Sequence, residues 1–175
     1  MIINKIYNTL RILFTKLRVS EYNKHINGRI NYTPQGEGTL TLSGNLKNFK
    51  ISATSRLKSS TLIECSGGVT IGRFCHFGKG LTIFSTNHNY KSEDMIPYDP
   101  TIIKRPVSIE DFVWIGANVT IAPGATIRKG SIVSTGSVIF GEIPECSIVR
   151  GNPASVIGYR DKISFKTLEE SMKYY

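Results

Sequence analysis

The sequence predicts an all-β fold, a parallel β-helix of short strands with a helix at each end. The first observation is an aliphatic residue that returns every six positions, at Ile109, Ile115, Ile121, Ile127, Val133 and Ile139. The second is a small or β-branched residue two positions before most of these, at Val113, Val119, Ala125, Ser131 and Ser137. This six-residue period with an inner period of two fits strands that turn every few residues, and it does not fit the 3.6-residue period of a helix.

Composition narrows the class of protein. The chain has 175 residues, 40% of them hydrophobic, which suits one domain with its own core. Its 22 Lys and Arg against 13 Asp and Glu give a net charge of +9, so the surface attracts anions. The basic residues are dispersed and form no nucleic-acid-binding motif, so we expect no nucleic-acid partner. The three cysteines show neither disulfide nor zinc spacing, and we expect no metal site.

Residues 1–20 predict an N-terminal amphipathic helix. Between residues 2 and 18 the apolar side chains recur at helical spacing, at Ile3, Ile6, Leu10, Leu13, Phe14 and Leu17. The charged residues between them are all basic, at Lys5, Arg11, Lys16 and Arg18. Two interpretations stay open: the helix caps the solenoid or packs on a sister subunit, or it binds an anionic membrane surface. No signal peptide is evident, so we expect a cytoplasmic protein, at most peripheral to the inner face of the membrane.

Residues 21–158 predict the β-helix domain. Asn27 to Gly44 leads into the first coil, and earlier hexads are marked by Ile51, Leu57, Ile71, Phe77 and Ile83. The hexads stop between Ile83 and Ile109, so residues 85–108 predict a projecting loop, of a kind that is usually functional or mobile. The repeats end after Gly151-Asn152-Pro153, and residues 159–175 predict a C-terminal extension with a short helix from Ile163 to Tyr175.

Three segments carry a resemblance to a known family. They are the run from Pro106 to Ile127, the loop Thr86-Asn87-His88-Asn89-Tyr90, and the closing stretch Gly151-Asn152-Pro153-Ala154 with Val156-Ile157. The chain resembles the hexapeptide-repeat acyltransferases, and within them the sugar O-acetyltransferases of the maltose, galactoside and surface-polysaccharide type. The resemblance implies a left-handed β-helix, acetyl-CoA as co-substrate, and a homotrimer of triangular prisms with active sites between subunits.

His88 is the candidate catalytic residue. Transfer of an acetyl group to a sugar hydroxyl needs a general base, and His88 alone of three histidines lies in the projecting loop, where it matches the family's catalytic histidine. A partner should fix its tautomer: the candidates are Glu64, Glu93, Asp94 and a backbone carbonyl. An 18-residue coil would stack Glu64 one layer from Thr82, close to where the loop leaves.

The resemblance also implies the binding residues. Ser66 stands where the family places an acidic side chain that holds the acceptor, and this departure leaves the acceptor open; the other acceptor candidates are Glu64, Asn87 and Asn89. The cofactor candidates match family positions or offer cations to the CoA phosphates: Trp114, Ala117, Thr135, Gly136, Phe140, Arg150 and Arg160, with Lys162 beside them. Trp114 fits either the core or the cleft.

The function predicted from the sequence is acetyl-CoA-dependent O-acetylation of a sugar, as a unit or precursor of a bacterial surface polysaccharide, with direct transfer and His88 as base. Two alternatives remain. One is N-acetylation of an amino sugar, since an amine needs less help from a base. The other is a catalytically silent scaffold that uses the same β-helix without a substrate.

Overall fold

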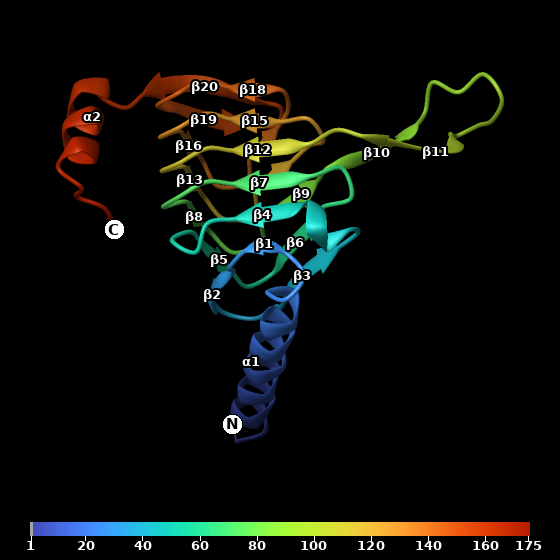
Figure 1. Ribbon diagram of the computed structural model, residues 1–175, viewed down its shortest axis with the longest axis horizontal. Coiled ribbons are helices and arrows are strands. Elements are labelled where there is room, and N and C mark those ends of the chain that lie inside the picture. The colour runs from blue at the N-terminus through green and yellow to red at the C-terminus, as the bar shows by residue number, and fades with distance from the viewer. Residues whose placement is uncertain (1) are drawn as a thin grey trace.

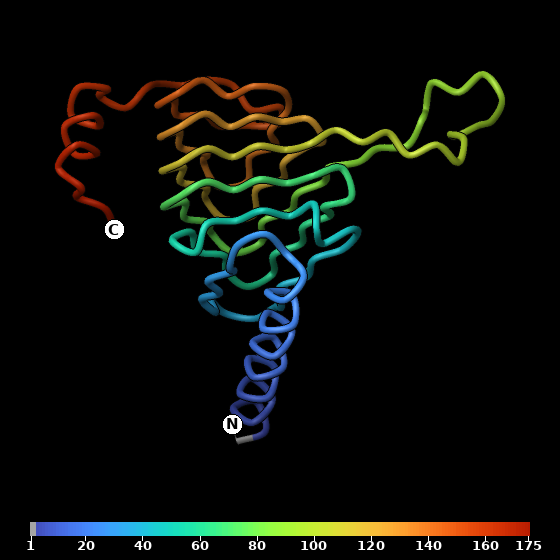
Figure 2. The backbone as a smooth tube through the Cα atoms, in the orientation of Figure 1, coloured from blue at the N-terminus to red at the C-terminus, as the bar shows by residue number. Residues whose placement is uncertain are grey.

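The protein is a three-sided column of short strands from which an arm and two helices project. The structure, a computed structural model, describes residues 2–175. The chain winds upward coil by coil, and each coil contributes one strand to each of three sheets except the last, which contributes to two of them (Figures 1 and 2). The parallel β-helix predicted from the hexads is therefore confirmed.

The three sheets are parallel except for one closing strand. Sheet 1 contains β1 (Asn27–Gly28), β4 (Phe49–Ile51), β7 (Val69–Ile71), β12 (Val107–Ile109), β15 (Thr126–Ile127) and β18 (Glu142–Ile143). Sheet 2 contains β2 (Asn31–Thr33), β5 (Arg56–Lys58), β8 (His76–Phe77), β13 (Trp114–Ile115), β16 (Ile132–Val133) and β19 (Ser147–Gly151), and β20 (Ala154–Tyr159) closes it antiparallel to β19. Sheet 3 contains β3 (Leu40–Ser43), β6 (Thr61–Glu64), β9 (Thr82–Phe84), β14 (Thr120–Ile121) and β17 (Val138–Ile139). A 3₁₀ turn, Leu46–Asn48, precedes β4.

The core is the stack of hexad side chains inside the column. All six aliphatic residues from Ile109 to Ile139 are buried, as are the small residues that precede them. Successive layers align these side chains: Ile83, Ile121 and Ile139 follow one another up sheet 3. Buried hydroxyls in the stack are hydrogen-bonded, as when Ser131 Oγ donates to the Pro144 carbonyl at 2.7 Å. The stack therefore removes apolar side chains from water without leaving these polar atoms unpaired.

The coils are not of equal length, and this corrects one prediction. Ile51 pairs with Ile71, 20 residues on, whereas Ile109 pairs with Ile127, 18 residues on. In the lower coil Glu64 consequently pairs with Phe84, and Leu62 takes the place beside Thr82. The prediction that Glu64 stacks by Thr82 was wrong because it assumed 18 residues in every coil. The two-residue difference places Glu64 next to the base of the arm.

The predicted projecting loop forms a two-stranded arm. It consists of β10 (Thr86–Asn89) and β11 (Asp99–Lys104), paired antiparallel, with a tip between them. The arm leaves the column where sheet 3 hands the chain to sheet 1 and extends away from it (Figure 1). Regular pairing resumes at β12, so the insertion ends two residues earlier than predicted.

The helices lie at opposite ends of the column. α1 (Ile2–Tyr22) runs downward from the first coil, and α2 (Lys162–Glu170) lies beside sheet 2 on the side away from the arm (Figure 1). α2 is shorter than the predicted 163–175 because it ends in a Schellman motif: Met172 adopts a φ of 51°, and the Lys173 N–H donates to the Leu168 carbonyl at 3.1 Å. The chain then turns back on the column. Neither described helix combines the length and hydropathy needed to cross a bilayer.

α1 contacts the first coil through its more polar face. Thr15 and Val19 are buried there, and the Arg11 guanidinium donates to the carbonyls of Gly36 and Gly38. The predicted apolar stripe faces outward, with large exposed side chains at Ile3, Ile6, Tyr7, Leu10, Leu13, Phe14 and Leu17. The helix thus covers the open end of the solenoid and still presents an unpartnered apolar face within the described chain.

Candidate active site

The base of the arm is held by one carboxylate. Glu64 Oε2 accepts hydrogen bonds from Thr86 Oγ1 at 3.0 Å and from the backbone N–H and hydroxyl of Ser85 at 3.2 Å each. Its Oε1 accepts from the Ser66 N–H at 2.7 Å. Ser85 is buried, and its single hydroxyl proton is shared between Glu64 Oε2 and the Glu64 carbonyl oxygen, which lies 2.9 Å away. These contacts tie the first two residues of the insertion to the coil below it.

The hydrogen bonds favour the ionised form of this carboxylate. Burial alone would raise the pKa of Glu64, but the bonds from Ser66, Thr86 and Ser85 outweigh it and hold the pKa below the ordinary value of 4.5. Glu64 is therefore a charged clamp at neutral pH. It bonds to the arm two residues before His88 and not to the imidazole itself.

His88 is exposed on β10, and its ring lies against an aromatic residue that the sequence did not single out. Its imidazole stacks on the Tyr98 ring, with centroids 3.9 Å apart and planes 16° from parallel. In the described chain no hydrogen bond to the imidazole involves Glu64, Glu93 or Asp94, the acidic candidates for its partner. Stacking on Tyr98 is what restrains the ring plane in this chain, and both ring nitrogens stay available to a substrate.

The neighbouring asparagines shape the arm. Asn87 Oδ1 accepts a hydrogen bond from the His88 N–H at 2.9 Å, and Asn89 Nδ2 donates to Asp99 Oδ2 at 2.7 Å across the two strands. Ser66 lies in the corner below, where its carbonyl accepts from Asn48 Nδ2 at 2.8 Å. The predicted acceptor residues therefore lie along one path, from the corner after β6 to the last residue of β10.

Trp114 faces outward from sheet 2. Its side chain is 54% exposed, which excludes the core alternative. It borders a groove of about 340 Å³ that is also lined by His76, Ala117 and Thr135, with the cations Arg56, Lys58 and Lys79 around it. The structure thus brings together three of the predicted cofactor residues and adds a basic rim.

Glycines line this groove, so its wall consists largely of backbone atoms. A Cβ on Gly78 would lie 2.5 Å from the Ala117 nitrogen, and one on Gly116 would lie 2.6 Å from the Thr135 nitrogen. Only glycine allows coils to approach so closely at this corner. The Ala117 N–H donates to Thr135 Oγ1 at 3.3 Å, and Gly136 follows with a φ of 74°. Little side chain obstructs an extended ligand there.

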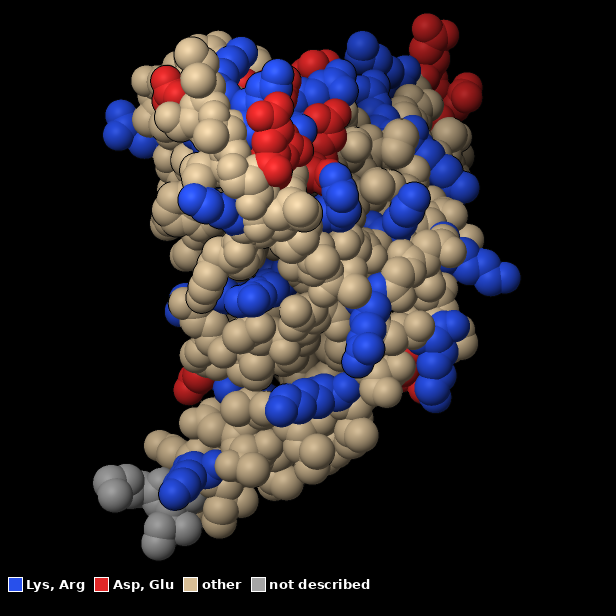
Figure 3. All heavy atoms as spheres, turned by 60° about the vertical axis from the view of Figure 1, so that its left-hand side comes forward, with Lys and Arg blue, Asp and Glu red and all other residues tan. Residues whose placement is uncertain are grey.

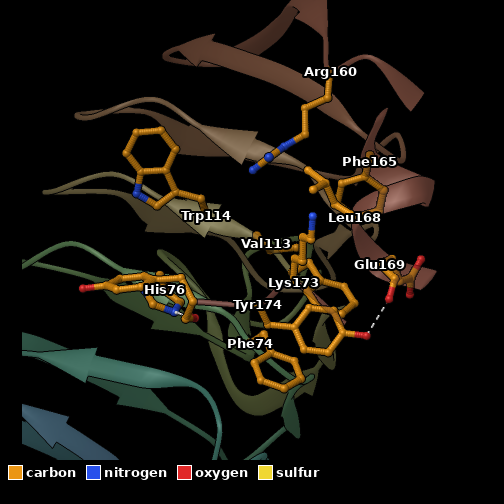
Figure 4. Close-up of a pocket in the computed structure, with 12 residues that line it drawn as sticks. Phe74, His76, Val113, Trp114, Arg160, Phe165, Leu168, Glu169, Lys173 and Tyr174 are labelled. Atoms are coloured by element: carbon orange, nitrogen blue, oxygen red, sulfur yellow. Dashed lines mark hydrogen bonds between the residues drawn. The ribbon is translucent and has the colours of Figure 1, made fainter. Parts of the chain in front are cut away.

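The other cofactor candidates lie apart from this groove. Phe140 is exposed at the corner after sheet 3, and Arg150 is exposed on β19. Arg160 joins Trp114 in lining a second cavity beside α2 (Figure 4). His76, which sequence reasoning passed over, borders both hollows, and its Nε2 lies 2.9 Å from the Tyr175 carbonyl oxygen.

One chain does not bring His88 to the groove. His88 is carried by the arm, which leaves between sheets 3 and 1, whereas Ala117 and Thr135 lie at the corner between sheets 2 and 3. The tube view shows the arm reaching outward from the column (Figure 2). The base candidate and the groove are therefore on separate corners of the same chain.

The cysteines are poor candidates for a nucleophile. Cys65, Cys75 and Cys146 are buried. Burial raises the pKa of both Cys65 and Cys75 to about 11, so both remain thiols at neutral pH. This leaves the exposed imidazole of His88 as the candidate proton acceptor in the predicted loop.

Comparison with known proteins identifies the repeat. The model of the bacterial transferase hexapeptide family (six repeats) matches residues 106–141. The chain is 38% identical over 98 residues to an Escherichia coli K12 protein named as a lipopolysaccharide-biosynthesis O-acetyl transferase. That alignment covers 51% of this chain and 49% of the relative, so the chain spans about half the length of that protein.

Two solved structures share the fold. A maltose O-acetyltransferase of Clostridium difficile 630 has a TM-score of 0.71 at 23% identity, over 90% of this chain and 86% of that one. A hexapeptide-repeat acetyltransferase of Vibrio cholerae, solved with acetyl-CoA, has a TM-score of 0.70 at 24% identity, over 83% and 78%. These similarities imply the left-handed form of the β-helix. They confirm the resemblance to hexapeptide-repeat acyltransferases.

Proposed function

Starting from a chain that carries the hexapeptide repeat of bacterial transferases, we propose that this protein is an acetyl-CoA-dependent O-acetyltransferase acting on a sugar hydroxyl. The observation that carries the proposal is His88, an exposed imidazole on an arm clamped by Glu64 and stacked on Tyr98. A unit or precursor of a bacterial surface polysaccharide is the proposed acceptor. The relative named for lipopolysaccharide biosynthesis supports that choice.

His88 would act as general base in a direct transfer. A neutral imidazole nitrogen accepts the proton of the sugar hydroxyl while the oxygen attacks the thioester carbonyl, and the proton then passes to the departing thiolate. A positioned general base is typically worth about 10²–10⁴ in rate. Tyr98 would limit ring rotation, and Glu64 would act as a positioning residue through Ser85 and Thr86.

Acetyl-CoA would lie with its pantetheine arm in the groove beside Trp114. Amide groups of pantetheine suit a wall of backbone near Ala117, Thr135 and Gly136, and the surrounding cations suit an anionic ligand. Phe140 and Arg150 would contact the same ligand from its edges. Acetyl-CoA in the Vibrio cholerae acetyltransferase supports this co-substrate.

Catalysis would require a homotrimer with active sites between subunits. The separation of His88 from the groove within one chain supports this, because a second copy must supply whichever half is missing. The acceptor would lie between the arm of one copy and the groove of another, against Ser66, the amide nitrogen of Asn87 and the remaining lone pairs of Asn89. Both carboxylate oxygens of Glu64 accept hydrogen bonds from its own chain, so Glu64 would shape the acceptor site by positioning the arm rather than by contacting the acceptor.

The test combines binding and turnover. Acetyl-CoA binding is measured by calorimetry, and thiol release is measured over a panel of neutral sugars, nucleotide sugars and amino sugars. His88→Ala should lower turnover at least about a hundredfold with oligomeric state and acetyl-CoA affinity retained. His25→Ala, in the turn between α1 and the first coil, should leave turnover unchanged. Near-normal turnover by His88→Ala would remove it as the base.

Two other outcomes separate the alternatives. Mass spectrometry that places the acetyl group on nitrogen would favour the amino-sugar N-acetyltransferase. A folded protein that binds no acetyl-CoA would favour the catalytically silent scaffold.

We also propose that α1 attaches the enzyme to the anionic inner face of the membrane. Its seven exposed apolar side chains form one stripe, and Lys5, Lys16 and Arg18 are its exposed charges up to residue 20. Like charges on every copy would repel in a homotypic helix bundle, whereas they suit anionic lipid. Figure 3 shows the helix as mostly uncharged surface broken by isolated blue side chains, while at the opposite end of that face Lys and Arg lie among acidic side chains.

Vesicle flotation tests the attachment. The protein should float with vesicles containing phosphatidylglycerol and not with pure phosphatidylcholine, and Leu10→Glu with Phe14→Glu should abolish flotation. Asn4→Glu with Thr9→Glu, off the stripe, carries the same added charge as a control. Flotation that survives the first pair, or an assembly that falls apart with it, would instead assign the stripe to a subunit contact.

A further inference from the structure

A polar cavity lies where α1 meets the first coil, at the end of the column opposite α2 (Figure 1). Its volume is about 520 Å³, within the range of small-molecule sites. One wall comes from α1, through Lys16, Ser20 and Asn23, and the facing wall comes from the first coil, through Arg29 and Asn31. We call this space the basal cavity. It is remote from both the arm and the groove beside Trp114, so the proposed transfer of an acetyl group does not account for it.

Two cations border the basal cavity, one on each wall. Lys16 belongs to α1, and Arg29 lies between β1 and β2. Within residues 2–175 neither side chain forms an ion pair, and no described residue that lines the cavity is Asp or Glu. Glu21, the acidic residue of α1, is already paired with Lys24 at 2.6 Å. The cavity therefore carries uncompensated positive charge and suits an anion.

Neutral hydrogen-bond donors accompany the two cations. Asn23 Oδ1 accepts from the Ile30 N–H at 2.8 Å, which joins the two walls and leaves Asn23 Nδ2 as a donor. The hydroxyl of Ser20 and the amide of Asn31 belong to exposed side chains of the same cavity. Lys16, Ser20 and Asn23 share one side of α1 because they are spaced by four and then three residues. Charged and neutral donors thus surround one space, as an oxyanion such as phosphate requires.

The basal cavity adjoins the apolar stripe of α1. Lys16 follows Leu13 by three residues and Ser20 follows Leu17 by three, and residues at this spacing are neighbours on a helix surface. Both leucines are exposed. A ligand whose anionic end lies in the cavity can therefore place an apolar part against the stripe. A phospholipid has this construction, because its phosphate is joined through glycerol to acyl chains.

We propose that the basal cavity binds the phosphodiester headgroup of an anionic membrane phospholipid, with Lys16 and Arg29 on the phosphate oxygens and the acyl chains against Leu13 and Leu17. The inference rests on the proposed attachment of α1 to the membrane and adds a discrete, saturable headgroup site to it. Guanidinium and ammonium groups form charge-assisted hydrogen bonds to phosphate oxygens. A basic pocket at the membrane surface selects lipids by headgroup, whereas dispersed cations respond to the overall surface potential.

The experiment uses dihexanoyl phosphatidylglycerol below its micelle concentration, so binding needs no bilayer. Calorimetry measures the affinity of the full chain for this lipid. Arg29→Gln and Lys16→Gln should each weaken it at least about fivefold, because each removes one charged contact to the phosphate. Lys50→Gln removes an exposed cation of β4 that does not line the cavity, and it should leave the affinity unchanged. Circular dichroism verifies that each variant is folded.

Two further ligands identify the source of the phosphate. Dihexanoyl phosphatidylcholine has the same acyl chains on a zwitterionic headgroup, and it should bind at least about tenfold more weakly than the phosphatidylglycerol. Inorganic phosphate lacks the chains that would contact the stripe, so it should also bind more weakly. If inorganic phosphate binds as tightly as the lipid, the cavity serves a soluble phosphate and the assignment to a membrane lipid is wrong.

The outcomes separate this inference from the attachment of α1. Arg29 lies outside the helix, so attachment by the stripe alone does not depend on it. If the protein floats with phosphatidylglycerol vesicles but Arg29→Gln and Lys16→Gln leave the short-chain lipid affinity unchanged, the headgroup site is wrong and the attachment stands. If the short-chain lipid binds through Arg29 and flotation fails, the headgroup site stands and the attachment is wrong. If neither the vesicles nor the short-chain lipid bind, both fail.

Discussion

Replacing Glu64 by glutamine tests whether one carboxylate holds the arm. Hydrogen bonds to a charged group are worth about 1.5–3 kcal/mol when lost. Glu64 is only half-buried, and glutamine keeps one acceptor oxygen, so Glu64→Gln should destabilise the fold by about 1–2 kcal/mol. For a chain of this size that lowers the Tm by about 3–6 °C. Glu93→Gln, exposed at the tip of the same arm, should change the Tm by less than about 1 °C.

The pH dependence gives this prediction a second, independent readout. The pKa of Glu64 is lowered in the folded protein, so its contribution is present above the ordinary pKa of 4.5 and is lost as the pH falls through the lower folded value. The Tm difference between wild type and Glu64→Gln should therefore be full at neutral pH and shrink below 4.5.

Thermal unfolding by circular dichroism measures the difference, and hydrogen exchange of the Thr86–Asn89 amides locates it. Equal Tm values at neutral pH together with equal exchange in the arm would refute the clamp. A difference that persists unchanged to low pH would show that shape, not charge, is responsible.

Two further substitutions test the column itself. Ile121→Asp should unfold a coil because it buries an unpaired charge at a fully buried position. The control Thr120→Asp, on the outer face of β14, should fold. If circular dichroism showed that Ile121→Asp folds, the hexad register would be wrong. Gly78→Ala should lower the urea midpoint more than Gly136→Ala, because its Cβ would lie 2.5 Å from the Ala117 nitrogen while Gly136 has open space and only the strain of its positive φ, about 1 kcal/mol. If Gly136→Ala lowered the urea midpoint more than Gly78→Ala, the corner between sheets 2 and 3 would be less tightly packed than the distance from Gly78 to Ala117 indicates.

The sequence predicted the upper column closely because its hexads are uniform. From Ile109 to Ile139 the period never varies, and each marked side chain is buried. Lower down, Gly67-Gly68 and their neighbours lengthen the coil to 20 residues. The assumption of a constant period therefore placed Glu64 beside Thr82, two residues away from its actual partner Phe84. An added turn residue leaves no periodic signal, so local pattern could not reveal it.

The candidate site was predicted in parts. His88 and the outward Trp114 could be found from motif and spacing, but the stacking of Tyr98 on His88 depends on how the arm pairs across ten residues. Ser85 did carry a signal, since it continues the inward alternation of Leu81 and Ile83. The face of α1 that contacts the first coil could not be predicted. The amphipathic pattern indicates the apolar stripe as the contact face, but the first coil instead binds Arg11, on another side of the helix.

The C-terminal residues 171–175, which turn back from α2 onto the column, give it a property that an ideal solenoid lacks. Repeats that contact only their neighbours can fray from an end one unit at a time. Here Tyr174 and Tyr175 lie against Phe74 and His76, so the last residues of the chain contact the column three coils below β19. Separation of β19 and β20 from the column must therefore also break the contact between His76 and Tyr175, which are 99 residues apart in sequence. The upper coils and α2 should therefore open together as one cooperative unit rather than in steps.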